Sequence, residues 1–144
     1  MQTYLHPPTS ARRQGAAAVE LAFMIPIFLA MVLGIFEFGR AVMVRQVISN
    51  AAREGVRQGI IPGATVTQVT TATNSYLSKG GVSSGNLVVE VKNGSGTTVT
   101  NLDTIKSHQP MRVFVSVPYN DVSWGPLRFL GGTTVQFTAE MRRE

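Results

Sequence analysis

The residues with the clearest chemical potential stand at the start of a long apolar run. Arg12 and Arg13 precede Gly15, and Glu20 is the only ionisable residue within residues 16–36. A charge inside a bilayer is costly, so a glutamate there predicts a functional site with a partner of opposite charge. The alternative is that Glu20 lies close enough to the lipid headgroups to stay hydrated without a partner. Both interpretations fit these residues.

Catalytic chemistry is not predicted. His6 and His108 are the only histidines, and neither accompanies a nucleophile or a carboxylate pair arranged for acid–base work. Asp103 and Asp121 are typical of turns and loops, and Trp124 is more typical of an exposed or loop-packed aromatic than of a binding platform. The chain has no cysteine, which excludes disulfides and thiolate metal sites. We therefore expect no enzyme activity, no cofactor and no metal.

Composition leaves room for one small domain beside the apolar run. The chain has 144 residues and a formal net charge of +5. Its basic residues are spread along the sequence and form no cluster interleaved with aromatics, so nucleic-acid binding is not predicted. A single domain of about a hundred residues is large enough to bury a core.

The apolar run predicts a retained membrane segment over residues 16–36. A helix of this length spans the hydrocarbon core of a bilayer, about 30 Å. The apolar region of a cleaved signal peptide is shorter, about 7–15 residues, and ends at a small-residue cleavage site that is missing here. Arg12 and Arg13 favour a cytoplasmic N-terminus, whereas Arg40 and Arg45 weaken the asymmetry. The polar, Thr-rich remainder is typical of an exported domain, so we expect the N-terminus inside and the C-terminus outside.

The helical period continues beyond the membrane segment. Apolar residues recur at spacings of three and four as far as Val56, which predicts one helix from about Ala16 to Gly59. Pro26 removes one hydrogen bond from that helix, so a kink or local melting is expected there. The second half of the helix is amphipathic, and a domain can pack against it.

A short second helix and a sheet are predicted for the remaining residues. Thr65 and Gln68 have capping-box spacing, which predicts a helix from Thr65 to about Leu77. Alternating residues then predict an antiparallel sheet of about four strands. The expected strands are 87–91, 97–100, 112–117 and 134–141, with a hairpin turn at 93–96.

The amphipathic half of the long helix is expected to face the sheet. We expect Phe38, Val42, Ile48 and Val56 to be covered by the apolar face of the strands. The expected covering residues are Val113, Val115 and Phe137. The predicted fold class is therefore α+β.

Several motifs of the first helix resemble one known family. The motifs are QGAAAVELA at 14–22, Pro26, GIFEFGR at 34–40 and NAAREGVR at 50–57. Together they closely resemble the TadE-like family, pilin-like (pseudopilin) components of the bacterial tight-adherence machinery that builds type IVc pili. The C-terminal AEMRRE at 139–144 is similar to the usual end of these proteins. The resemblance is strong over residues 14–59, and it implies a pilin-like fold.

The resemblance implies processing of the N-terminus. Residues 1–15 would be a prepilin-type leader, which a prepilin peptidase cuts between Gly15 and Ala16. The cut would create an α-amino group at Ala16. In pilin-like packing, Glu20 of one subunit would face this ammonium group of its neighbour.

Partners and location also follow from the resemblance. The expected partners are a prepilin peptidase, other pilins or pseudopilins, the inner-membrane pilus assembly platform and lipid. The chain would cross the bacterial inner membrane once, with residues 37–144 as a periplasmic or extracellular pilin-like domain, and could enter a surface pilus. The alternative is an unprocessed, single-pass anchored protein whose outer domain binds a partner or ligand.

Overall fold

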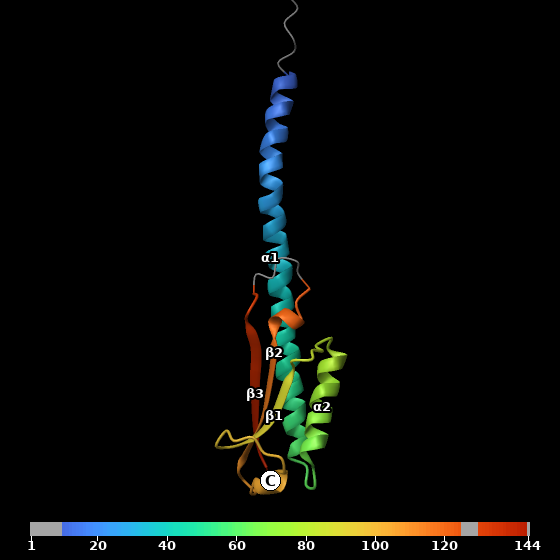
Figure 1. The fold of residues 1–144 in the computed structure, drawn as a ribbon, viewed down its shortest axis with the longest axis vertical. Helices are drawn as coiled ribbons and strands as arrows, with labels where there is room; N and C mark the ends of the chain where they lie inside the picture. The colour runs from blue at the N-terminus through green and yellow to red at the C-terminus, as the bar shows by residue number, and fades with distance from the viewer. Residues whose placement is uncertain (1–9, 125–129, 144) are drawn as a thin grey trace, which may run out of the picture. The chain divides into compact units, whose positions relative to one another are not determined.

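The computed structural model describes residues 10–124 and 130–143. The first helix, α1, runs over Ser10–Gly59, and α2 runs over Val66–Lys79. Three strands follow, β1 (Val88–Asn93), β2 (Pro110–Pro118) and β3 (Thr134–Arg142). Two short 3-10 turns, Leu102–Thr104 and Tyr119–Asp121, lie on either side of β2. Figure 1 follows this order along the chain.

Contacts divide the chain into two compact units that meet between Phe36 and Glu37. The described part of the first unit is helical throughout, as the apolar run predicts. The assigned helix continues through Pro26, and the kink expected there stays a prediction. The second unit holds the rest of α1, together with α2 and the sheet.

Local sequence signals explain the bounds of α2. Thr65 is the N-cap, and its side chain accepts a hydrogen bond from the backbone N–H of Gln68. The Gln68 side chain accepts in return from the Thr65 N–H at 2.9 Å, which completes the predicted capping box. The chain leaves the helix at Gly80, and Gly81 follows with a φ of 69°. Glycine adopts this left-handed conformation without strain, so the helix ends here.

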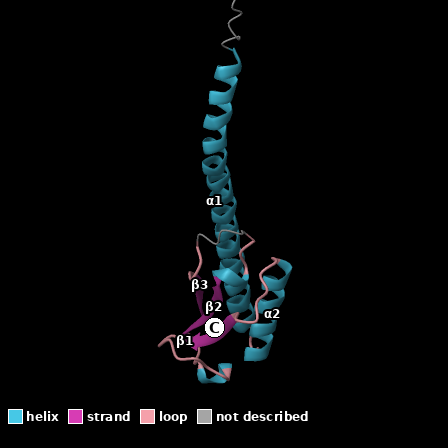
Figure 2. Cartoon of the chain, turned by 45° about the horizontal axis from the view of Figure 1, so that its top comes forward, coloured by secondary structure: helices cyan, strands magenta, loops and turns pink. Residues whose placement is uncertain are grey.

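The strands form one antiparallel sheet in the order β1-β2-β3. Val91 pairs with Val113, and Val113 pairs with Ala139, so all three side chains point to the same face. In β2 every second residue from Met111 to Val117 is buried, which is the alternation that its sequence predicts. The fold is therefore α+β, as expected (Figure 2).

The expected fourth strand is wrong, because the sheet has three strands. Residues 97–100 return beside β1 only briefly, through a single bridge between Lys92 and Thr98. The Asn101 side chain then accepts a hydrogen bond from the Asp103 N–H and caps a 3-10 turn. That turn buries Leu102, so the chain bends into the core instead of extending the ladder.

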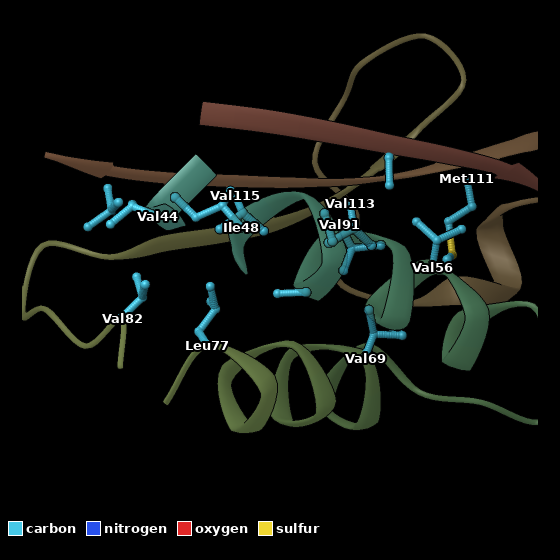
Figure 3. Close-up of a cluster of buried hydrophobic side chains, with 14 of the residues drawn as sticks. Val44, Ile48, Val56, Val69, Leu77, Val82, Val91, Met111, Val113 and Val115 are labelled. Atoms are coloured by element: carbon cyan, nitrogen blue, oxygen red, sulfur yellow. The ribbon is translucent and has the colours of Figure 1, made fainter. Parts of the chain in front are cut away.

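The core forms where the second half of α1 lies between α2 and the sheet (Figure 3). The buried positions of α1 follow one helical stripe, which includes Ile48 and Val56 as predicted. The other buried apolar side chains of α1 are Val44, Ala51 and Ala52. The expected covering residues Val113 and Val115 are fully buried, and Phe137 is partly buried against the same cluster.

The prediction that the sheet covers Phe38 and Val42 of α1 is wrong. Their side chains are 67% and 42% exposed, so the sheet does not cover them as predicted. Both line an open groove between α1 and the residues 133–136 at the start of β3. The reason is helical phase, because Val44 and Ile48 stand on the stripe that faces the sheet and Phe38 and Val42 stand beside it.

Glycine at position 55 permits the close approach of α1 to α2 and β2. A Cβ atom at Gly55 would lie 2.2 Å from Thr73 Oγ1 and 3.4 Å from Val113 Cγ1. Thr73 is fully buried, and its hydroxyl donates to the Val69 carbonyl at 2.8 Å, so it has little freedom to move. The small residues at 51, 52 and 55 thus have a packing role.

We predict opposite effects for the same substitution at two glycines of α1. Gly55→Ala forces the added methyl group against Thr73, and such overpacking costs about 1–3 kcal/mol. Gly39→Ala is the matched control, because no atom lies within 4 Å of a Cβ built there. In a helix it should gain up to about 1 kcal/mol from higher helix propensity. Thermal unfolding of the full chain in detergent micelles, followed by circular dichroism, measures both changes. A Gly55→Ala protein as stable as Gly39→Ala would contradict this packing.

Candidate functional site

The residues expected at the cleavage site and in the ion pair with a neighbouring subunit lie in the first unit. Gly15, Ala16 and Glu20 are all part of α1, and all three are exposed. The spacing of four residues puts Glu20 one helical turn after Ala16, on the same face of the helix. A Cβ atom built at Gly15 would have no neighbouring atom within 4 Å. The cleavage at Gly15 and the pairing of Glu20 stay predictions.

The apolar side chains around these residues are largely exposed. Eleven large apolar residues between Val19 and Phe36, including Phe23 and Phe28, are 46–73% exposed, whereas Val32 and Leu33 are half-buried. The helix is long and apolar enough to cross a membrane, and none of its most apolar stretch is buried. A helix that is apolar all round requires an apolar environment, which lipid or other helices supply. The residues of the first unit are therefore suited to contacts outside the domain.

A polar cluster fixes the start of the second unit. We call it the junction cluster, and its members come from α1 and from the residues after β2. They are Glu37, Arg40, Tyr119, Ser123 and Trp124. Glu37 and Arg40 are only 4% and 6% exposed, although both side chains carry charge.

Two residues in the segment after β2 donate hydrogen bonds to Glu37. The Tyr119 hydroxyl donates to the Glu37 backbone carbonyl at 2.8 Å, and the Ser123 hydroxyl donates to Glu37 Oε1 at 3.0 Å. Burial raises the pKa of the Tyr119 hydroxyl, and the Glu37 carboxylate adds to this rise. The hydroxyl is therefore protonated and able to donate across the physiological range.

Arg40 joins α1 to two other segments. Its Nε donates to the Val122 carbonyl at 2.9 Å, and one terminal nitrogen donates to the Gly81 carbonyl at 3.0 Å. Its Cζ atom also lies 4.2 Å from the centre of the Trp124 ring, a cation–π distance. One side chain thus connects α1 to the chain after α2 and to the chain after β2.

The sequence did not reveal the junction cluster. The motif at 34–40 was noted for its family resemblance, and Arg40 also for weakening the charge asymmetry. Trp124 was expected to be an exposed or loop-packed aromatic. Trp124 is indeed exposed, at 77%, but it also stacks with Arg40. The available signal was a pair of charges one turn apart, Glu37 and Arg40, directly after the apolar run. Their partners lie 41 residues later at Gly81 and about eighty residues later at the other positions, too far apart for local sequence patterns to connect.

The acidic residues considered for catalysis have structural contacts. Asp121 accepts hydrogen bonds from the Ser84 hydroxyl and the Asn86 side-chain amide, which lower the pKa of its carboxyl. Asp103 lies in the 3-10 turn after β1, near Arg143. His108 is exposed and His6 lies outside the described residues. Among residues 10–124 and 130–143 no three His, Cys, Asp or Glu side chains gather as a metal site would require.

We predict that the buried arginine stabilises the domain far more than an exposed one. Arg40→Gln removes the donors to Val122 and Gly81 and the stacking with Trp124. Hydrogen bonds to a charged group are worth roughly 1.5–3 kcal/mol each, so we expect a clear loss of thermal stability. Arg45→Gln, the same change at an exposed position of the same helix, should stay within about 0.5 kcal/mol. Urea unfolding of the full chain in detergent measures the difference, and equal losses would show that Arg40 has no special role.

Comparison with known proteins points to the same helix. Residues 15–57 match the family model described as TadE-like protein. No curated protein and no solved structure matches the chain. The matched range contains Gly15 and Glu20, the α1 side of the junction cluster, and the small residues that pack against α2. The match confirms the family resemblance predicted from the motifs: the first helix of this protein is TadE-like.

Proposed function

We propose that this protein is a pilin-like (pseudopilin) structural component for assembly of a tight-adherence type IVc pilus. The proposal is carried by one observation, that the TadE-like match falls on a helix whose apolar half is largely exposed. Such a helix suits a subunit that is stored in a membrane and then packs against other helices. A structural role of this kind requires no catalytic residues.

The subunit is processed before assembly. A prepilin peptidase cuts between Gly15 and Ala16 and removes residues 1–15, including Arg12 and Arg13. The exposure of Gly15 and the free space around it support access of a peptidase to this backbone. The product begins with a new ammonium group at Ala16.

That ammonium group is the partner of Glu20 in the assembled state. Within one chain Ala16 and Glu20 are one turn apart, but a neighbouring subunit can present its own Ala16 to Glu20. Each charge is poorly solvated at the edge of a bilayer, and pairing compensates part of the desolvation cost. The pair therefore favours helices that are aligned side by side over isolated ones.

Membrane topology follows from the same proposal. Residues 16–36 cross the bacterial inner membrane, the N-terminus is cytoplasmic, and residues 37–144 form the periplasmic or extracellular domain. Its partners are other pilins or pseudopilins and the inner-membrane assembly platform, with lipid around the helix before assembly. The competing function is an unprocessed anchored protein with a partner-binding domain, and the two experiments below separate them.

We expect the mature chain to begin at Ala16 when a prepilin peptidase is co-expressed. Gly15→Phe should block the cut, because a bulky side chain obstructs the approach of the peptidase to the backbone. Gly39→Phe places the same side chain at another exposed glycine of α1 and should be cut normally. Intact mass and N-terminal sequencing of the membrane-extracted protein measure the result. An intact Met1 in the presence of active peptidase would favour the unprocessed anchor.

We expect Glu20→Gln to separate insertion from assembly. The apolar run is unchanged, so the variant should be inserted and cut. It leaves a neighbour's Ala16 ammonium uncompensated, and loss of one partner of a buried pair costs up to roughly 3–5 kcal/mol, less where headgroup water reaches it. Cross-linking and co-purification with the pilus machinery should therefore fall sharply.

Glu20→Asp is the matched control for this experiment. It keeps a negative charge at the same residue, although the carboxylate lies one methylene closer to the backbone, and should retain much of the co-purification. Recovery of Glu20→Gln at the wild-type level, with normal surface adherence, would reject the pairing. It would also favour a hydrated Glu20 on a simple anchor.

A further inference from the structure

Trp124 is a large aromatic residue that the described part of the domain leaves largely exposed. It is the only tryptophan of the chain, and its side chain is 77% exposed. One face of its ring lies over the Arg40 guanidinium, 4.2 Å from the ring centre. Tryptophan is enriched in membrane-interface belts, where one end of its side chain is apolar and the other is hydrated, so its position relative to the membrane segment decides what this ring can contact.

Chain length restricts where Trp124 can lie with respect to a membrane. Arg40 follows Phe36, the last residue of the apolar run, by four residues. Four residues rise about 6 Å in a helix and reach about 14 Å even when fully extended. The interfacial zone on each side of a bilayer is about 5–8 Å thick. With Phe36 at the edge of the hydrocarbon core, Arg40 and the ring stacked on it are held at or next to the headgroup zone.

The first turns of the second unit reverse the usual order of polar and apolar side chains. Glu37 and Arg40 are buried, whereas Phe38 is 67% exposed. The polar groups are satisfied by the protein itself, since Ser123 donates to Glu37, and Arg40 donates to the Val122 and Gly81 carbonyls. This arrangement suits a surface that faces a water-poor environment, because its polar groups need no solvent.

We propose that Trp124 and Phe38 insert into the headgroup interface of the bilayer, as a second membrane contact beside the helix. Tryptophan is favoured at this depth because its ring is apolar and its N–H reaches polar groups. The contact fixes the end of the domain next to Arg40 on the lipid surface. This inference rests on the membrane anchoring in the proposed function, but not on processing or on Glu20.

The sole tryptophan provides the test. The full chain is reconstituted in phosphatidylcholine and phosphatidylglycerol vesicles whose acyl chains are brominated either near the headgroup or near the methyl end. We expect loss of Trp124 fluorescence mainly with the shallow bromines, and protection from the aqueous quencher acrylamide. Trp124→Phe should abolish the signal, which assigns it to this residue.

A transferred tryptophan is the matched control. The double variant Trp124→Phe/Ile61→Trp places the reporter at an exposed site after the end of α1, roughly 28 Å of helix beyond Arg40. Its fluorescence should respond to acrylamide and to neither brominated lipid. If Ile61→Trp were quenched by lipid as strongly as Trp124, the contact would not be specific, and the inference would be wrong.

The remaining outcomes separate this inference from the proposed function. A chain that floats with the vesicles but shows Trp124 quenched by acrylamide alone is anchored, and the interfacial contact is wrong. Protection from acrylamide that disappears when the protein is diluted within the vesicles means that a second copy covers Trp124, which also overturns the lipid contact. A chain that does not float overturns the anchoring and this inference together.

Discussion

One helix supplies both compact units, and the rest of the structure depends on the change in its surroundings near Glu37. Between Gly15 and that residue the side chains of α1 are almost all apolar, and most of them are exposed. After it, a single stripe is buried between α2 and the sheet, and the remaining faces are largely polar. The two halves suit different surroundings, and the change between them coincides with the boundary of the two compact units.

Close packing on the second half of α1 sets the shape of the domain. Ala51, Ala52 and Gly55 give the helix a narrow face, and the side chains of α2 and β2 approach it closely. Thr73 illustrates how tightly this space is filled, because its hydroxyl has a backbone partner and lies where a larger residue at position 55 would need room. A packing requirement of this kind restricts the residues at 51–55 without any contact to a ligand.

Local signals were sufficient to predict most of the elements. The capping box at Thr65, the alternation of β2 and the glycines after α2 all act within a few residues, so they can be recognised in the sequence. The strand expected at 97–100 could not be excluded in this way. Its end depends on the burial of Leu102 and on the cap at Asn101, which compete with the hairpin ladder.

The sequence did not predict correctly which face of α1 is buried, and it did not reveal the junction cluster. Phe38, Val42, Val44 and Ile48 are all apolar, and periodicity alone does not say which two of them the sheet covers. The usual rule places apolar residues inside and charges outside, so it selected Phe38 and overlooked Glu37 and Arg40. The partners that reverse the rule, Tyr119 to Trp124, are far away in sequence.

The burial of two ionisable residues in the junction cluster has an energetic explanation. A free carboxylate or guanidinium placed beside a bilayer loses much of its hydration, and an unpaired polar group in such a place is costly. In the proposed membrane arrangement, Glu37 and Arg40 would avoid this cost because they have hydrogen bonds with hydroxyl and carbonyl groups of the same domain. Glu20 lies in the first unit, where none of the described hydrogen bonds or ion pairs involves its side chain. In that arrangement the two acidic residues of one helix meet the same problem in different ways: Glu37 is satisfied by its own fold, whereas Glu20 requires hydration or the proposed ammonium group of a neighbouring subunit.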